Sequence, residues 1–167
     1  PRGGMTWAVI AILLLVTAQR LGELWLSNRN TRRLLDQGAV EAGRGHYPLL
    51  VAVHVAWLAA LWWWAPGQVI NWALMTVFML LQVARLWVIA TLGTRWTTRI
   101  IVLPDAPLVR GGPFRFVDHP NYLIVALEIA VLPLAFGLAG VALTFSILNA
   151  AILTVRIRSE NKALAYD

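Results

Sequence analysis

Long runs of apolar residues constrain this chain more than any other feature of its sequence. Five runs stand out, at residues 6–26, 48–64, 69–92, 122–137 and 138–155. An α-helix needs about 20 apolar residues to cross a bilayer, and backbone groups inside lipid must satisfy their own hydrogen bonds. The sequence therefore predicts an all-α integral membrane protein with five transmembrane helices, in a single domain over residues 1–167. Residues 1–4 precede Met5 and are interpreted as a cloning remnant.

The composition supports this class of protein. Hydrophobic residues make up 59% of the chain and charged residues only 13%, whereas a soluble domain is about 25% charged. Cysteine is absent and the three histidines lie far apart, so no disulfide and no metal site is expected. The 14 basic residues against 8 acidic ones would suggest nucleic-acid binding in a soluble protein. Here they lie between apolar runs, so we expect no nucleic-acid partner.

The distribution of the basic residues predicts the orientation of the helices. Basic residues concentrate after the first and third apolar runs and in the tail, whereas residues 65–68 and 137–140 carry none. Because basic connectors stay on the cytoplasmic side, the N-terminus is predicted outside and the C-terminus in the cytoplasm. Residues 137–140 then join the last two helices in a tight hairpin at the outer face.

The longest polar segment covers residues 93–121. It contains four prolines and a Gly-Gly-Pro step, which break any long helix. A loop of this length in a small protein is usually functional. We therefore expect this cytoplasmic loop to contribute to a site.

Charged residues inside the apolar runs are the strongest sign of a site that comes from physical chemistry alone. Arg20 and Glu23 lie in the first predicted helix, Arg85 in the third and Glu128 in the fourth. Charges at membrane depth are unfavourable unless they pair or act in function. Counting 1.5 Å per residue from the cytoplasmic helix ends places Arg20, Arg85 and Glu128 at a similar depth of roughly 10 Å. They are predicted to converge, either as a site or as an ion-pair cluster that only fixes packing.

The last predicted helix carries three polar residues on one face. Asn149, Arg156 and Glu160 are spaced by seven and four residues, which aligns them along one stripe of a helix. On its own, this stripe does not require a functional site. It also fits an arginine that extends its charge to the membrane surface and a glutamate exposed to solvent.

The segment 108–122 reads LVRGGPFRFVDHPNY and resembles the isoprenylcysteine carboxyl methyltransferase family. That family combines a Gly-Pro-aromatic step, a His-Pro-x-Tyr motif, a Glu nine residues after the His, and a terminal Arg-x-x-x-Glu. The corresponding residues here are His119, Glu128, Arg156 and Glu160, and the resemblance spans about residues 104–164.

Residues 38–48 and 155–160 resemble more narrowly the short bacterial branch of this family. That branch includes methyltransferases acting on alkylpyrone or alkylresorcinol lipids. The resemblance therefore implies a bacterial inner-membrane enzyme whose active site faces the cytoplasm.

The resemblance further implies S-adenosylmethionine as cofactor and a lipophilic acceptor, either a prenylcysteine-like carboxylate or a polyketide-derived pyrone or phenolic lipid. Arg156 and Glu160 are implied as catalytic, and Arg156, Glu128 and Arg85 as substrate-binding. A weaker match adds a cofactor contact at Arg99. The implied cofactor contacts are Ala106, Pro107, Leu108, Val109, Phe114, His119, Pro120, Asn121, Tyr122 and Glu160.

Two positions depart from the family pattern. The family usually has Arg at the position of Asp118 and a second Glu at the position of Asn161. If these residues touch, an Asp–Asn hydrogen bond has replaced an ion pair.

Two other functional classes stay open. Sterol-type membrane reductases carry a similar His-Pro-x-Tyr region, and a non-catalytic lipid-binding protein would fit the altered positions. The oligomeric state is not predicted.

Overall fold

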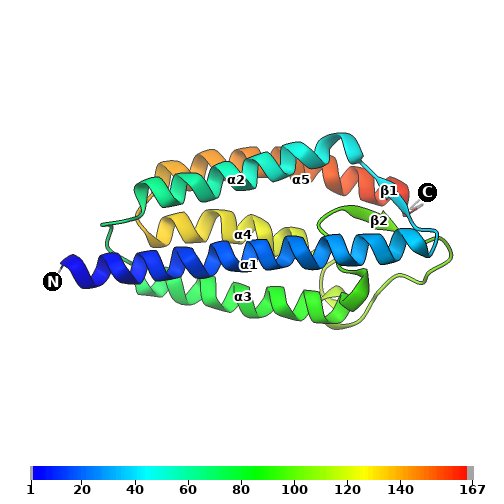
Figure 1. The fold of residues 1–167 in the computed structure, drawn as a ribbon, viewed down its shortest axis with the longest axis horizontal. Helices are drawn as coiled ribbons and strands as arrows, with labels where there is room; N and C mark the ends of the chain where they lie inside the picture. Colours follow the sequence, from blue (N-terminus) through cyan, green and yellow to red (C-terminus); the bar gives the residue numbers. More distant parts are fainter. Residues whose placement is uncertain (1, 165–167) are drawn as a thin grey trace.

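The structure is a computed structural model that describes residues 2–164, with side chains from Thr6 onward. Within this part, five long helices run side by side along one axis (Figure 1). They are α1 (Arg2–Asp36), α2 (Tyr47–Trp64), α3 (Trp72–Leu92), α4 (Pro120–Ala135) and α5 (Ala139–Ala163). Of the residues interpreted as a cloning remnant, Pro1 lies outside the described part, and the backbone of 2–4 forms the start of α1.

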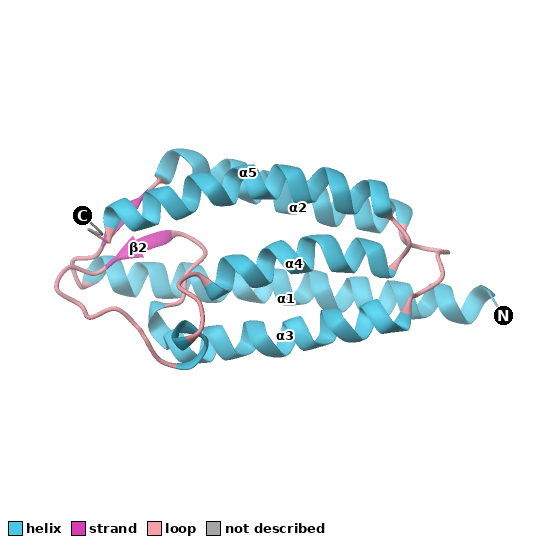
Figure 2. Cartoon of the chain, turned by 180° about the vertical axis from the view of Figure 1, so that it is seen from behind, coloured by secondary structure: helices cyan, strands magenta, loops and turns pink. Residues whose placement is uncertain are grey.

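Successive helices alternate in direction, so two connections and the end of the last helix share one end of the bundle (Figures 1 and 2). The segment between α1 and α2, the long segment between α3 and α4, and the end of α5 all lie there. We call this end the loop end. Helices α1, α2, α3 and α5 are long and apolar enough to cross a membrane, whereas the apolar helix α4 has 16 residues.

The predicted tight hairpin between the last two helices is confirmed. Gly137 has a φ of 73°, a left-handed conformation that glycine adopts without strain at the end of a helix. The backbone N–H of Leu138 donates to the carbonyl of Pro133 at 2.9 Å and closes the turn. As a result α4 and α5 lie antiparallel, and the start of α4 and the end of α5 both lie at the loop end.

Helix α1 is longer than predicted. It continues to Asp36, ten residues beyond the predicted end at residue 26, so Arg29, Arg32 and Arg33 lie on a helix and not in a connector. No glycine or proline lies between residue 26 and Gly38, where φ reaches 89°. This extension carries α1 past the apolar core and alongside the segment that follows α3.

The all-α class fits the structure, but a small two-stranded sheet at the loop end was not predicted. Strand β1 (Val40–Ala42) pairs antiparallel with β2 (Ile100–Val102), with Glu41 opposite Ile101. Each strand has three residues, too few to show an alternating pattern. The sheet joins the first connector to the third and forms one side of the loop end.

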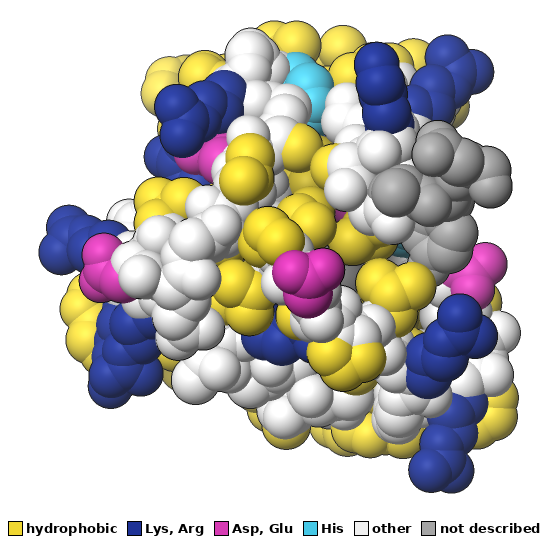
Figure 3. All heavy atoms as spheres, turned by 90° about the vertical axis from the view of Figure 1, so that its right-hand side faces the viewer, with side chains coloured by type: hydrophobic (Ala, Val, Ile, Leu, Met, Phe, Trp, Pro, Cys, Tyr) yellow, Lys and Arg dark blue, Asp and Glu magenta, His cyan; other side chains and the backbone are white. Residues whose placement is uncertain are grey.

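Side-chain burial separates a packed interior from an apolar outer surface. Leu13, Trp57 and Ile129 are almost fully buried between the helices. Many large apolar side chains face outward, and Trp63 is 80% exposed. An apolar exterior of this extent suits lipid and not water. In the end-on view of Figure 3, Lys and Arg side chains lie around the margin of the loop end and hydrophobic side chains occupy its middle.

Candidate functional site

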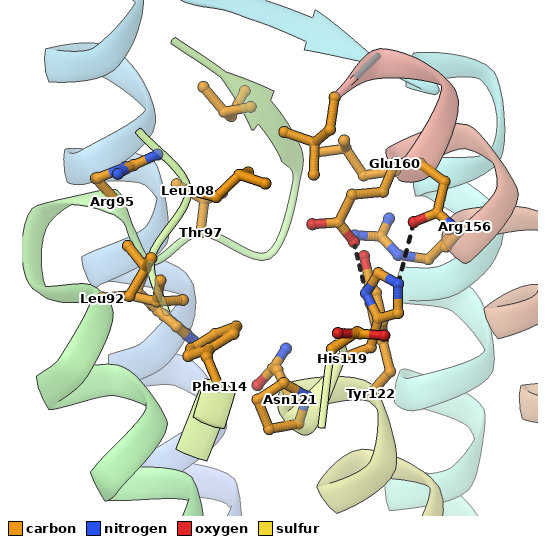
Figure 4. A pocket seen from close by; sticks show the side chains of 18 of the residues that line it. Leu92, Arg95, Thr97, Leu108, Phe114, His119, Asn121, Tyr122, Arg156 and Glu160 are labelled. Atoms are coloured by element: carbon orange, nitrogen blue, oxygen red, sulfur yellow. Dashed lines mark hydrogen bonds and ion pairs between the residues drawn. The ribbon is translucent and has the colours of Figure 1, made fainter. Parts of the chain in front are cut away.

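The main cavity lies at the loop end and has a volume of about 650 Å³. This is within the range of about 300–1,000 Å³ that is typical of small-molecule sites. Figure 4 shows Leu92, Arg95 and Phe114 on one side of the space and Arg156 and Glu160 on the other. The walls therefore come from the end of α3, the long connector, the start of α4 and the end of α5.

Close packing against α3 shapes the connector that covers this cavity. Gly112 opens a short helical turn, η3 (Gly112–Arg115), and has a φ of 54°. A Cβ atom at Gly112 would lie 2.5 Å from Thr91 Oγ1, so a larger residue fits there only if the connector or the Thr91 side chain shifts. Earlier in the connector, Arg95 Nη1 donates to the carbonyl of Pro107 at 2.8 Å.

The His-Pro-x-Tyr motif forms the first turn of α4. Pro120 occupies a position where its missing N–H is not needed for the helix, and His119 directly precedes it. His119 Nε2 lies 3.1 Å from Asn161 Oδ1, and its Nδ1 lies 3.6 Å from Glu160 Oε2. The His119 and Tyr122 rings are 5.5 Å apart. This turn therefore binds directly to the end of α5.

The suggested Asp118–Asn161 hydrogen bond is wrong. Asn161 contacts His119 instead, and Asp118 is exposed at the cavity rim. Within the described residues no hydrogen bond joins Asp118 to Asn161, so the structure gives no direct contact through which one change would compensate for the other.

Arg156 is buried, with 3% of its surface exposed. Its Nη2 donates to the carbonyl of Thr98 at 2.7 Å, and its guanidinium carbon lies 5.8 Å from the centre of the Tyr122 ring. The Nε and Nη1 donors are buried and have no hydrogen-bond partner within residues 2–164. Because buried polar groups are normally paired, these donors are suited to a bound oxygen ligand.

A second, smaller cavity of about 190 Å³ lies between α1, α2, α4 and α5. Apolar side chains such as Leu50, Leu58 and Leu153 form much of its wall. An apolar cavity of about 150 Å³ is large enough to hold benzene, so this one has room for a ring or a short length of chain. It shares four wall residues with the main cavity: Trp96, Asn121, Tyr122 and Arg156. Arg156 therefore lies where the two cavities meet.

The predicted convergence of Arg20, Arg85 and Glu128 is confirmed, and Glu23 joins them. Arg20 Nη2 lies 2.7 Å from Glu128 Oε2, and Arg85 contacts both Glu23, at 2.6 Å, and Glu128, at 3.2 Å. Arg20 also lies 3.6 Å from Glu23 on its own helix. Gln82 donates to Glu128 at 2.9 Å. We call Arg20, Glu23, Arg85 and Glu128 the charge cluster.

The charge cluster borders the smaller cavity through Arg20, Glu23 and Arg85. Glu128 is fully buried, and within the described residues its carboxylate accepts from Arg20, Gln82 and Arg85. Of the three residues implied to bind substrate, the structure thus brings Arg156 and Arg85 to a cavity wall but not Glu128.

Most of the implied cofactor residues gather at the main cavity. Eight line it: Leu108, Val109, Phe114, His119, Pro120, Asn121, Tyr122 and Glu160. Arg99 also lines it, although its guanidinium pairs with Glu41 at 2.8 Å. Ala106 and Pro107 are not on the wall, since the Ala106 N–H and the Pro107 carbonyl bond within the connector.

Sequence reasoning missed part of the wall. Trp96, Thr97, Ile100 and Ile101 line the main cavity, but they lie in the unpredicted strand and just before it. Two signals were present: Trp96, the single tryptophan of residues 93–121, and the apolar run at 100–103.

The polar atoms of the main cavity suit a ligand with both donors and acceptors. Asn121 Oδ1 is a buried acceptor and Trp96 Nε1 a buried donor, and neither has a hydrogen-bond partner within the described residues. Glu160 Oε2 is also buried without a hydrogen bond, although His119 Nδ1 lies 3.6 Å from it. Over residues 2–164, no group of three His, Asp or Glu side chains could hold a metal ion.

Comparison with known proteins adds independent information. The sequence profile of the isoprenylcysteine carboxyl methyltransferase family matches residues 73–166, more than half of the chain. The chain is 36% identical to the uncharacterized protein YpbQ of Bacillus subtilis (strain 168), across 96% of each protein. It is 29% identical to an uncharacterized protein of Haemophilus influenzae, covering 90% of this chain and 91% of that protein. No solved structure matches it significantly.

Proposed function

The chain belongs to the isoprenylcysteine carboxyl methyltransferase family, and we propose that it transfers a methyl group from S-adenosylmethionine to a lipophilic acceptor within the membrane. The observation that carries this proposal is the position of Arg156. It lies where a large, partly polar cavity at the loop end meets a smaller, mostly apolar one inside the bundle. A soluble donor and a lipid acceptor could meet at such a junction.

The residues of the main cavity fit the proposed cofactor. The free acceptors Glu160 Oε2 and Asn121 Oδ1 match the amino and hydroxyl donors of S-adenosylmethionine. Leu108, Val109 and Phe114 offer an apolar face for its adenine ring. When bound, this cofactor supplies a methyl group activated by a sulfonium.

The smaller cavity is the proposed site for the acceptor. The two free donors of Arg156 can hold an anionic oxygen through the planar guanidinium. A carboxylate is already ionised near neutral pH and needs no base. A phenol or enol would need one, and Glu160 and His119 are the groups placed to serve.

The protein contributes chiefly alignment and exclusion of water. Arg156 fixes the acceptor oxygen, while the connector of residues 93–121 covers the cofactor. The hydrocarbon chain of such an acceptor is too long to fit inside the smaller cavity. We therefore propose that the rest of the chain extends between the helices into lipid. This arrangement is consistent with a prenylcysteine-like carboxylate and with a polyketide-derived pyrone or phenolic lipid.

We further propose that all five helices cross the bacterial inner membrane. Helix α4 spans about 24 Å at 1.5 Å per residue, slightly less than the hydrocarbon core of about 30 Å. Its alternation in direction with α3 and α5 (Figure 1) supports a crossing. The basic side chains at the loop end (Figure 3) support a cytoplasmic location for that end and for the active site.

Calorimetric titration of the purified protein with S-adenosylhomocysteine and with NADPH tests the reaction class. Binding of S-adenosylhomocysteine is expected. Binding of NADPH alone would point to a reductase instead. Binding of neither would point to a non-catalytic lipid-binding protein.

The role of Arg156 is tested with two acceptor probes, N-acetyl-S-farnesylcysteine and 3-pentadecylphenol. Arg156→Ala should abolish methyl transfer while S-adenosylhomocysteine still binds. The matched control is Arg158→Ala, an exposed arginine on the same helix, which should leave transfer unchanged. Loss of S-adenosylhomocysteine binding in Arg156→Ala would instead assign Arg156 to the cofactor.

A further inference from the structure

Three hydroxyl groups from different parts of the chain form a connected network behind Arg156. Ser27 Oγ lies 2.8 Å from Thr98 Oγ1, and the Tyr47 hydroxyl lies 2.9 Å from the same atom. Ser27 is on α1, Tyr47 opens α2, and Thr98 lies just before β2. Ser27 and Tyr47 both precede residue 73, where the match to the family profile begins.

This network holds the backbone of Thr98 on both sides. The Thr98 N–H donates to Ser27 Oγ at 2.8 Å. The Thr98 carbonyl accepts from Arg156 Nη2 at 2.7 Å. A movement of the Thr98 peptide would therefore move the group that orients the guanidinium.

The preceding segment is fixed by the same face of α1. Asn30, one turn beyond Ser27, donates from Nδ2 to the carbonyl of Trp96 at 2.8 Å and lies 3.3 Å from that of Gly93. Ser27 is fully buried and Asn30 is 2% exposed. Neither lines the main cavity or the smaller one, so neither side chain is placed to contact a ligand in these two cavities.

We propose that Ser27 is a positioning residue for Arg156, acting through Thr98, with Tyr47 as its partner. An arginine side chain has many rotamers, and fixing one before the acceptor binds removes an entropic penalty. The Thr98 carbonyl occupies Nη2, which leaves Nε and Nη1 for the acceptor oxygen. The inference rests on the proposed function, because it assigns Arg156 to the acceptor.

The first test observes Arg156 directly and does not need activity. In protein labelled with ¹⁵N-arginine, the Arg156 Nε–H signal is assigned by its loss in Arg156→Lys. Ser27→Ala should shift or broaden this signal. The control is Thr31→Val, which removes a buried α1 hydroxyl that has no partner in the described part of the chain; it should leave the signal in place. An unchanged Arg156 signal in Ser27→Ala would overturn the inference.

The second test measures kinetics with the two acceptor probes. Ser27→Ala should lower kcat/KM for the acceptor about tenfold, the effect of losing hydrogen bonds worth about 1.4 kcal/mol, while S-adenosylhomocysteine affinity changes less than twofold. Thr98→Val should act similarly and Thr98→Ser should retain activity. These paired variants keep the test valid if Ser27→Ala folds poorly.

A double-mutant cycle separates positioning from a general structural role. In the Arg156→Lys background, Ser27→Ala should lower kcat/KM less than twofold further. A full tenfold loss in that background would refute action through Arg156. If the wild-type protein neither binds S-adenosylhomocysteine nor transfers methyl, the proposed function itself is contradicted. If the wild-type protein transfers methyl and Ser27→Ala leaves kcat/KM unchanged, only this inference is contradicted.

Discussion

Replacing Glu128 by glutamine should strongly destabilise the protein. The Glu128 carboxylate is fully buried and accepts from Arg20, Arg85 and Gln82. Glutamine keeps the shape but removes the negative charge, so Arg20 and Arg85 would share Glu23 alone. Removing one member of a buried ion pair costs about 3–5 kcal/mol. For a chain of this size, that corresponds to a fall in Tm of roughly 6–15 °C.

Thermal unfolding in detergent micelles, followed by tryptophan fluorescence, measures this effect. The matched control is Asp36→Asn, which removes the same charge from an exposed residue at the end of α1 and should change Tm by less than about 2 °C. Combining Glu128→Gln with Arg20→Gln restores the balance of charge and should recover part of the lost stability. A Tm for Glu128→Gln within about 2 °C of wild type would refute the reasoning.

The same variant also distinguishes the two interpretations of the charge cluster. If the cluster only fixes packing, the Glu128→Gln protein that remains folded at low temperature should keep its KM for both acceptor probes. If the cluster contacts the acceptor through Arg20 or Arg85, KM should rise while S-adenosylhomocysteine affinity is retained.

Three further predictions follow from individual sites. Gly112→Ala should weaken S-adenosylhomocysteine binding at least fivefold by calorimetry, because its Cβ would meet Thr91 and displace the connector; unchanged affinity would show that the connector does not cover the cofactor. Asp118→Arg should alter kcat/KM less than twofold, since Asp118 is exposed and makes no contact that orients the site; a tenfold loss in the methyl-transfer assay would contradict that interpretation. Because the chain has no cysteine, single-cysteine variants can report orientation: an impermeant maleimide should label Gln68→Cys in intact cells and Arg110→Cys only after lysis, and the reverse pattern would invert the proposed topology.

The apolar runs were sufficient to predict the helices because lipid allows few other structures. The hairpin at Gly137 followed from its position between two such runs. The convergence of Arg20, Arg85 and Glu128 followed from their equal depth, because charges at membrane depth must find partners. These predictions needed only the lipid environment and the geometry of an α-helix. Both can be inferred from the positions of apolar and charged residues along the chain.

The loop end was harder to predict because long-range pairing determines it. Ser27 and Asn30 are polar, so the end of α1 looked like a connector, yet both are buried against the segment after α3. The pairing of β1 with β2 joins residues about 60 positions apart, and neither strand is long enough to show an alternating pattern. Asn161 was assigned the wrong partner for the same reason, since only the fold brings it to His119.

The charge cluster also has a consequence for how the protein enters the membrane. Synthesis proceeds from the N-terminus, so Arg20 and Glu23 reach the bilayer well before Arg85, 62 positions after Glu23, and Glu128, 108 positions after Arg20. A single charge at the centre of an inserting helix is unfavourable by about 3 kcal/mol. During this interval the first helix carries its own counter-ion, since Arg20 and Glu23 lie one turn apart and 3.6 Å from each other. The opposite charges of Arg20 and Glu23 therefore compensate each other in the nascent helix until α3 and α4 have inserted and completed the charge cluster.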